Sequence, residues 1–115
     1  MPRRQPTMSW DRLRDLTEKW TWEVTTRGGQ RVRTQGFNPP EGSGAQRVPF
    51  HIRYLTLDGR LEDGFCTCLK VFVHGNADTH RGCRQRMIQF VESHEVRRIC
   101  DILVLEVDGI RIFAQ

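Results

Sequence analysis

The chain has 115 residues, which is enough for one domain with a modest hydrophobic core. No apolar run approaches the roughly 20 residues that a membrane-spanning helix needs, and no apolar stretch follows Arg3 and Arg4 as it would in a secretory signal. We therefore expect a cytoplasmic protein without membrane association. The net charge is +4, and every basic residue except Lys19 and Lys70 is an arginine.

The N-terminal part divides into a tail and the start of a domain. Residues 1–8 are polar and basic, which predicts a disordered tail, and residues 9–115 form a single small β-rich domain. Ser9 is a suitable N-cap for a helix from about Trp10 to Trp20. Its apolar residues recur at helical spacing, so the helix is amphipathic and should pack on a sheet.

The middle of the chain predicts two hairpins. Residues 22–26 and 30–36 flank a Gly-Gly pair and favour a hairpin, although the helix could instead continue through Trp22. A loop follows at about 36–47, where prolines and glycines gather. Residues 49–57 alternate in polarity, Asp58-Gly59 is a hairpin turn, and a strand should follow over 62–74 with a bend near Gly64.

The last third predicts a meander of adjacent antiparallel strands. Residues 86–91 and 96–100 are two of them. Ile102–Val107 is apolar on both faces, which is typical of a buried central strand. Asp108-Gly109 then predicts a tight turn into residues 110–114, because glycine adopts positive φ without steric cost.

Together these elements predict a mostly β fold with one N-terminal amphipathic helix. The architecture would be a β-barrel or a strongly bent antiparallel sheet of the SH3-like kind, and an α+β roll is the alternative. The expected core consists of Trp10, Leu13, Phe50, Ile52, Ile88, Phe90, Ile99, Leu103, Leu105 and Ile112.

Two stretches carry a resemblance to known proteins. One is Phe50–Leu57 with Asp58-Gly59, and the other is the block Arg86–Phe113 with Glu95–Ile99, Asp101–Val104 and Val107-Asp-Gly. They resemble small β-barrel proteins of bacterial accessory and phage genomes, and the small SH3-like barrel of WYL-type domains. The similarity covers about half of the chain and lies in turns and core positions. It implies a small-barrel fold more than any activity. The Trp-Tyr-Leu signature that names the WYL group is absent.

A cluster of metal-ligating residue types lies between positions 66 and 83. Zinc takes four thiolate or imidazole ligands, and Cys66, Cys68, His80 and Cys83, with His74 nearby, contain enough of them. Their spacing differs from the paired ligands of zinc ribbons and fingers. Cysteine is also a frequent small core residue, so the sequence favours a core role for Cys66 and Cys68 and no cofactor.

No motif of a known enzyme class is present, so we expect a non-enzymatic binding domain. The sequence favours a protein-interaction module, in which an open sheet edge accepts a partner or a second copy of the chain. The alternative is a small barrel that binds nucleic acid through arginine clusters and stacking aromatic residues. The candidate residues for that alternative are Arg12, Arg14, Arg27, Arg31, Arg33, Arg84, Arg86, Arg97 and Arg98.

Overall fold

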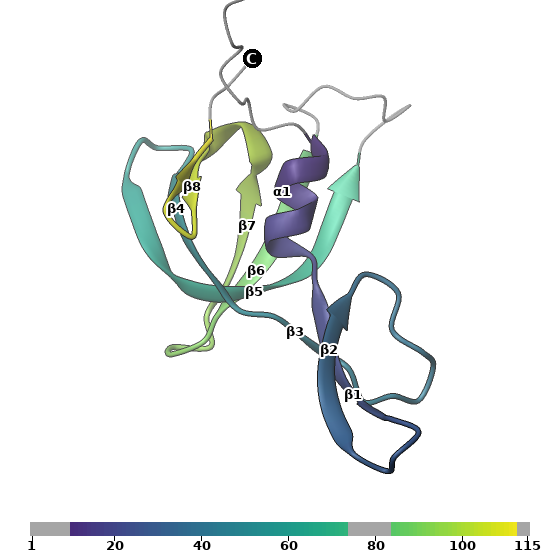
Figure 1. Ribbon diagram of the computed structural model, residues 1–115. Helices are drawn as coiled ribbons and strands as arrows, with labels where there is room; N and C mark the ends of the chain where they lie inside the picture. Colours follow the sequence, from purple (N-terminus) through teal and green to yellow (C-terminus); the bar gives the residue numbers. More distant parts are fainter. Residues whose placement is uncertain (1–9, 74–83, 113–115) are drawn as a thin grey trace, which may run out of the picture.

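The computed structural model describes residues 10–73 and 84–112. Within them, one short helix, α1 (Trp10–Thr17), precedes nine strands (Figure 1). A 3-10 turn, Asp101–Leu103, precedes β8. The strands are β1 (Trp20–Thr25), β2 (Arg31–Gly36), β3 (Gln46–Arg47), β4 (Phe50–Leu55), β5 (Leu61–Val73), β6 (Arg84–Phe90), β7 (Val96–Cys100), β8 (Val104–Val107) and β9 (Ile110–Arg111).

The strands form two antiparallel sheets. The larger sheet has the order β7-β6-β5-β4-β8-β9, and the smaller one has the order β2-β1-β3. The long strand β5 bends across the larger sheet (Figure 1), and its register with β6 shifts between Cys68 and Lys70. Since β7 and β9 each pair on one side only, the described strands form an open, bent sheet and no closed barrel. The predicted mostly β class with one short helix is confirmed.

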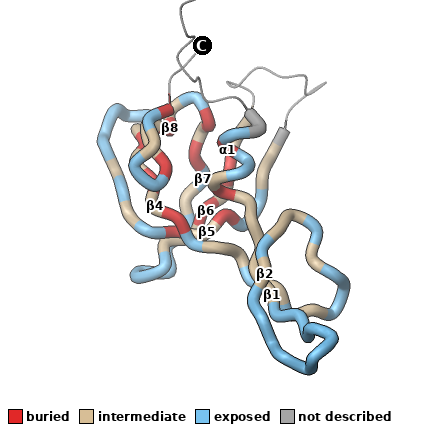
Figure 2. Tube along the Cα trace, in the orientation of Figure 1, coloured by how far each residue is buried: buried red, intermediate tan, exposed pale blue. Residues whose placement is uncertain are grey.

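The core lies in the concave side of the larger sheet (Figure 2). Alternation along β4 buries Phe50, Ile52 and Tyr54 and leaves the residues between them less buried. Six of the expected core residues are buried, namely Leu13, Phe50, Ile52, Ile88, Ile99 and Ile112. Phe90, Leu103 and Leu105 are only partly buried, and the Trp10 side chain lies outside the described residues. Tyr54, Val104 and Val107 are buried as well, although the sequence did not predict them in the core.

Both Asp-Gly turns join hairpin strands as predicted. At the second, Asp108 and Gly109 have φ angles of 51° and 79°, and the turn connects β8 to β9. The Asp108 backbone N–H donates to the His51 carbonyl at 2.8 Å, and the Asp108 carboxylate accepts from the His51 N–H at 2.9 Å. The turn is therefore also fastened to β4.

The predicted central strand over Ile102–Val107 is wrong in its first half. Asp101–Leu103 forms the 3-10 turn, Ile102 is exposed, and β8 begins only at Val104. β8 pairs with β4 and β9 instead of β7, so the expected meander ends after β7. The physical reason is the buried Asp101 carboxylate, which is bound to Arg86 and turns the chain away from the β6–β7 ladder.

The helix also ends earlier than expected. It stops at Thr17, whose hydroxyl donates to the Leu13 carbonyl at 2.8 Å, and the chain enters β1 at Trp20. The alternative of a helix through Trp22 is therefore wrong, and the predicted hairpin forms. We call this β1–β2 hairpin, Trp20–Gly36, the arm, because it projects from the body of the molecule (Figure 1).

Arg86 corrects one of the nucleic-acid-binding assignments. Its side chain is 0% exposed, so it cannot reach a phosphate in solution. The guanidinium donates to both Asp101 carboxylate oxygens, at 2.8 and 3.3 Å, to the Thr17 hydroxyl at 2.9 Å and to the Glu18 carboxylate at 2.6 Å. Burial alone lowers the pKa of a guanidinium, but the two carboxylates raise the pKa of Arg86 above its ordinary value, so it stays charged.

Replacing Asp101 by alanine should destabilise the protein by about 3–5 kcal/mol, because it leaves the buried Arg86 charge without its bidentate partner. The measurement is urea unfolding followed by tryptophan fluorescence. The matched control is Glu106→Ala, which breaks a partly exposed pair with Arg53 and should cost about 1 kcal/mol or less. Equal effects of the two variants would contradict the role assigned to Arg86.

Candidate binding groove

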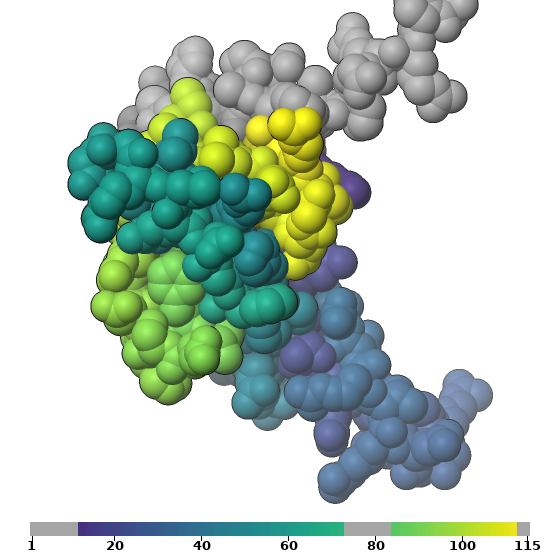
Figure 3. Space-filling model, turned by 90° about the vertical axis from the view of Figure 1, so that its left-hand side faces the viewer, coloured from purple at the N-terminus to yellow at the C-terminus, as the bar shows by residue number. Residues whose placement is uncertain are grey.

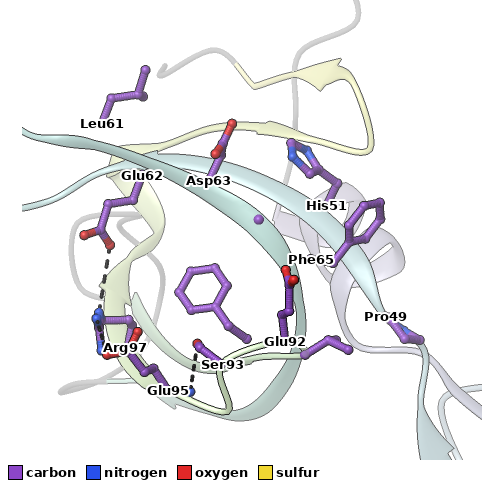
Figure 4. Close-up of a pocket in the computed structure, with 13 residues that line it drawn as sticks. Pro49, His51, Leu61, Glu62, Asp63, Phe65, Glu92, Ser93, Glu95 and Arg97 are labelled. Atoms are coloured by element: carbon purple, nitrogen blue, oxygen red, sulfur yellow. Dashed lines mark hydrogen bonds and ion pairs between the residues drawn. The ribbon is translucent and has the colours of Figure 1, made fainter.

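A groove of about 1060 Å³ lies between the first half of β5 and the turn that joins β6 to β7 (Figure 4). Because β5 bends, its first residues separate from the β6–β7 hairpin and leave this space. We call it the acidic groove. It is lined by Pro49, His51, Leu61, Glu62, Asp63, Gly64, Phe65, Phe90, Val91, Glu92, Ser93, Glu95 and Arg97.

One wall of the acidic groove is an unpaired strand edge. On one side, residues 61–66 of β5 pair with β4. On the other side the pairing with β6 begins only at Cys66, and none of the described strands lies opposite Leu61–Gly64. The Phe65 carbonyl accepts from the Val91 N–H at 2.9 Å, so it points to the β6 side. Since backbone groups alternate along a strand, those of Leu61 and Asp63 point the same way, into the groove.

Apolar side chains line the same strand. Phe65 is 61% exposed and Leu61 is also exposed, on the outer face of β5. The His51 ring meets the Phe65 ring edge-on at 5.2 Å between centroids. On the inner face the Phe90 ring lies against Gly64, where an added Cβ would come within 3.0 Å of it. The groove therefore offers apolar contact on both faces of the unpaired edge.

Carboxylates outnumber cations in the acidic groove. Four carboxylates line it, from Glu62, Asp63, Glu92 and Glu95, and Arg97 is the only arginine among the lining residues. Arg97 lies 3.2 Å from Glu95 and 3.9 Å from Glu62. Figure 4 shows this bridge at one end of the groove, away from Asp63 and Glu92. In a chain with a net charge of +4, the groove is locally negative by about three charges.

Glu62 also binds the core. The Tyr54 hydroxyl donates to its carboxylate at 2.5 Å. Burial, and then this hydrogen bond, raise the pKa of Tyr54 well above its ordinary value, so the phenol stays protonated and keeps donating. Glu62 is therefore fixed in position, while Asp63 on the opposite face of β5 is exposed.

The arginines that the sequence assigned to nucleic acid are dispersed over the described residues. Arg12 and Arg14 are on α1, and Arg14 stacks on Phe37 at 4.3 Å. Arg98 of β7 stacks on Phe72 at 4.0 Å, and Arg84 begins β6. Arg27, Arg31 and Arg33 are exposed on the arm. Apart from buried Arg86, these positions leave nucleic-acid binding as an untested prediction.

Cys66 and Cys68 lie in the core, as the sequence favoured. Both are buried side chains on the inner face of β5. Burial raises the pKa of the Cys66 thiol to about 12 and also raises the pKa of Cys68. His74, His80 and Cys83 lie outside the described residues. Among the described residues, no group of three or more His, Cys, Asp or Glu side chains could hold a metal ion.

The sequence did not predict the acidic groove, because its lining residues come from two distant segments, 49–65 and 90–97. The alternation of side chains along β5 does indicate which of its residues are exposed. Once Cys66 and Cys68 face the core, Leu61, Asp63 and Phe65 must face solvent. What the sequence did not give is the bend that brings Glu92 and Glu95 beside them.

Comparison of the chain with protein-family models, with curated protein sequences and with solved structures returns no match. The resemblance to SH3-like and WYL-type barrels therefore stays a prediction. The described part of the chain contains no helix with the length and apolar character needed to cross a membrane.

Cys66 and Cys68 should resist alkylation by iodoacetamide at about pH 8 in the folded protein. With a pKa of about 12, the Cys66 thiolate is roughly a thousandfold rarer than that of a free cysteine, and the thiol is also buried. Peptide mapping by mass spectrometry measures the modification, with the partly exposed Cys100 as the internal comparison. Rapid alkylation of Cys66 without denaturant would contradict its place in the core.

Proposed function

We propose that the protein is an interaction module whose acidic groove binds an extended, basic segment of a protein partner. The observation that carries the proposal is the unpaired edge of β5 at Leu61 and Asp63, beside carboxylates and exposed Phe65. A strand that pairs with this edge would gain main-chain hydrogen bonds, and pockets beside it would select alternate side chains. β-Augmentation is therefore the proposed mode of binding.

The negative charge of the acidic groove favours a basic partner. Its negative excess attracts lysine and arginine side chains and repels phosphates, which favours a protein segment over nucleic acid. On the inner face of β5, the Glu62 carboxylate is already bound by Tyr54 and Arg97, and Phe90 offers apolar contact. On the outer face, the Asp63 carboxylate is exposed. Because successive side chains of a strand point to opposite faces, a segment in which basic and apolar residues alternate would place its basic residues beside Asp63 and its apolar residues against Phe90.

The test is fluorescence anisotropy with a short labelled peptide in which arginine and valine alternate. The wild-type protein should bind it, more weakly at high salt, and should not bind a peptide in which glutamate replaces arginine. The variant Asp63→Lys/Glu92→Lys should lose about tenfold or more in affinity, because two attractions become repulsions.

The matched control is Asp15→Lys/Glu41→Lys, which makes the same charge change at two exposed positions outside the groove. It should lose much less affinity. A second variant, Phe65→Ser, removes an exposed apolar contact without touching the core and should also weaken binding. Equal affinity of the groove variant and its control would show that the acidic groove is not the binding site.

A further inference from the structure

The arm also has an edge that no other described strand covers. β2 pairs with β1 and is the outer strand of the order β2-β1-β3. β3 pairs with β1 only at Trp20 and Thr21, so beyond Thr21 the arm is a two-stranded ribbon. An isolated two-stranded hairpin is at best marginally stable in water. A ribbon that projects in this way is stabilised when another surface covers it.

The arm exposes apolar side chains on one face and charged side chains on the other, as a binding surface without its partner would. Val24 and Val32 face each other across the two strands and are 38% and 40% exposed. On the other face, Arg31 and Arg33 flank Glu23 at 4.0 and 3.7 Å, and all three side chains are at least half exposed. Such exposed pairs hold their partners weakly. β2 is thus an edge strand in which arginine and valine alternate over its first three residues, Arg31–Arg33.

The arm does not fill the acidic groove of its own chain. None of the residues that line the groove comes from Trp20–Gly36. In Figure 3 the arm, in blue, projects away from the β6–β7 hairpin, in green. The two surfaces lie on one molecule, have complementary charge, and are separated in space.

We propose that β2 of one copy adds as a strand to the Leu61–Gly64 edge of β5 in the acidic groove of a second copy. This inference rests on the proposed function and names a second copy of the chain as the partner. The unpaired residues Leu61–Gly64 span about 13 Å and the six residues of β2 span about 20 Å, so β2 is long enough to cover this edge. Two copies that exchange arms make two equivalent arm-to-groove contacts, related by a two-fold axis.

The experiment is sedimentation equilibrium of the full chain over a range of protein and salt concentrations. The wild-type mass should rise above the 13.5 kDa monomer with concentration, and salt should reverse the rise. The arm variant Glu23→Arg/Arg31→Glu/Arg33→Glu keeps opposite charges paired within the arm but changes the charge of the β2 edge from positive to negative. It should stay monomeric. The groove variant Asp63→Lys/Glu92→Lys should also stay monomeric.

Mixing the two variants is the decisive measurement. An intact basic arm then meets an intact acidic groove, and the reversed arm meets the reversed groove, so association should return. Arg12→Glu changes the net charge as much as the arm variant does, at an exposed position on α1, and should associate like the wild type. Failure of the mixture to associate, or a wild type that stays monomeric at low salt, would overturn the inference.

Peptide binding separates this inference from the proposed function. The arm variant retains an unaltered acidic groove and should bind the arginine–valine peptide at least as well as the wild type does. If the wild type binds the peptide but never self-associates, the second copy is not the partner and the groove still binds a basic segment. If neither occurs, both proposals fail.

Discussion

The buried guanidinium of Arg86 joins parts of the chain that are far apart in the sequence. It binds Thr17 and Glu18 at the end of α1 and Asp101 in the 3-10 turn before β8. An ion inside a protein is costly unless all its hydrogen bonds are made, so this network tolerates little displacement of its members. It holds α1 against the larger sheet. It also holds the 3-10 turn that directs the chain from β7 to β8, which pairs with β4.

Glu18 links the Arg86 network to the base of the arm. Its carboxylate binds Arg86, and its carbonyl accepts from the Arg47 guanidinium at 2.6 Å. Arg47 stacks on the Trp20 ring at 4.0 Å, and the Val48 N–H donates to the Lys19 carbonyl at 2.9 Å. The base of the arm is therefore fastened to the body, while its distal part is exposed. This places an exposed basic ribbon and an acidic groove at separate, fixed positions on one molecule.

The sequence predicted what local rules determine. Both Asp-Gly turns and the Gly-Gly hairpin follow from backbone preferences of a few neighbouring residues, and the alternation in β4 follows from strand geometry. Non-local features could not be predicted in this way. Ile102–Val107 has an apolar pattern that suits a strand, but burial of Asp101 against Arg86 overrides it. The groove depends on where β5 separates from β6, which no local pattern marks.

Amide hydrogen exchange with and without the arginine–valine peptide, followed residue by residue by NMR, tests most directly whether a partner strand pairs with β5 in the acidic groove. The N–H groups of Leu61 and Asp63, which point into the groove, should exchange more slowly in the complex. That of Glu62 points to β4 and should change little. Peptide binding that leaves the exchange at Leu61 and Asp63 unchanged would contradict strand addition.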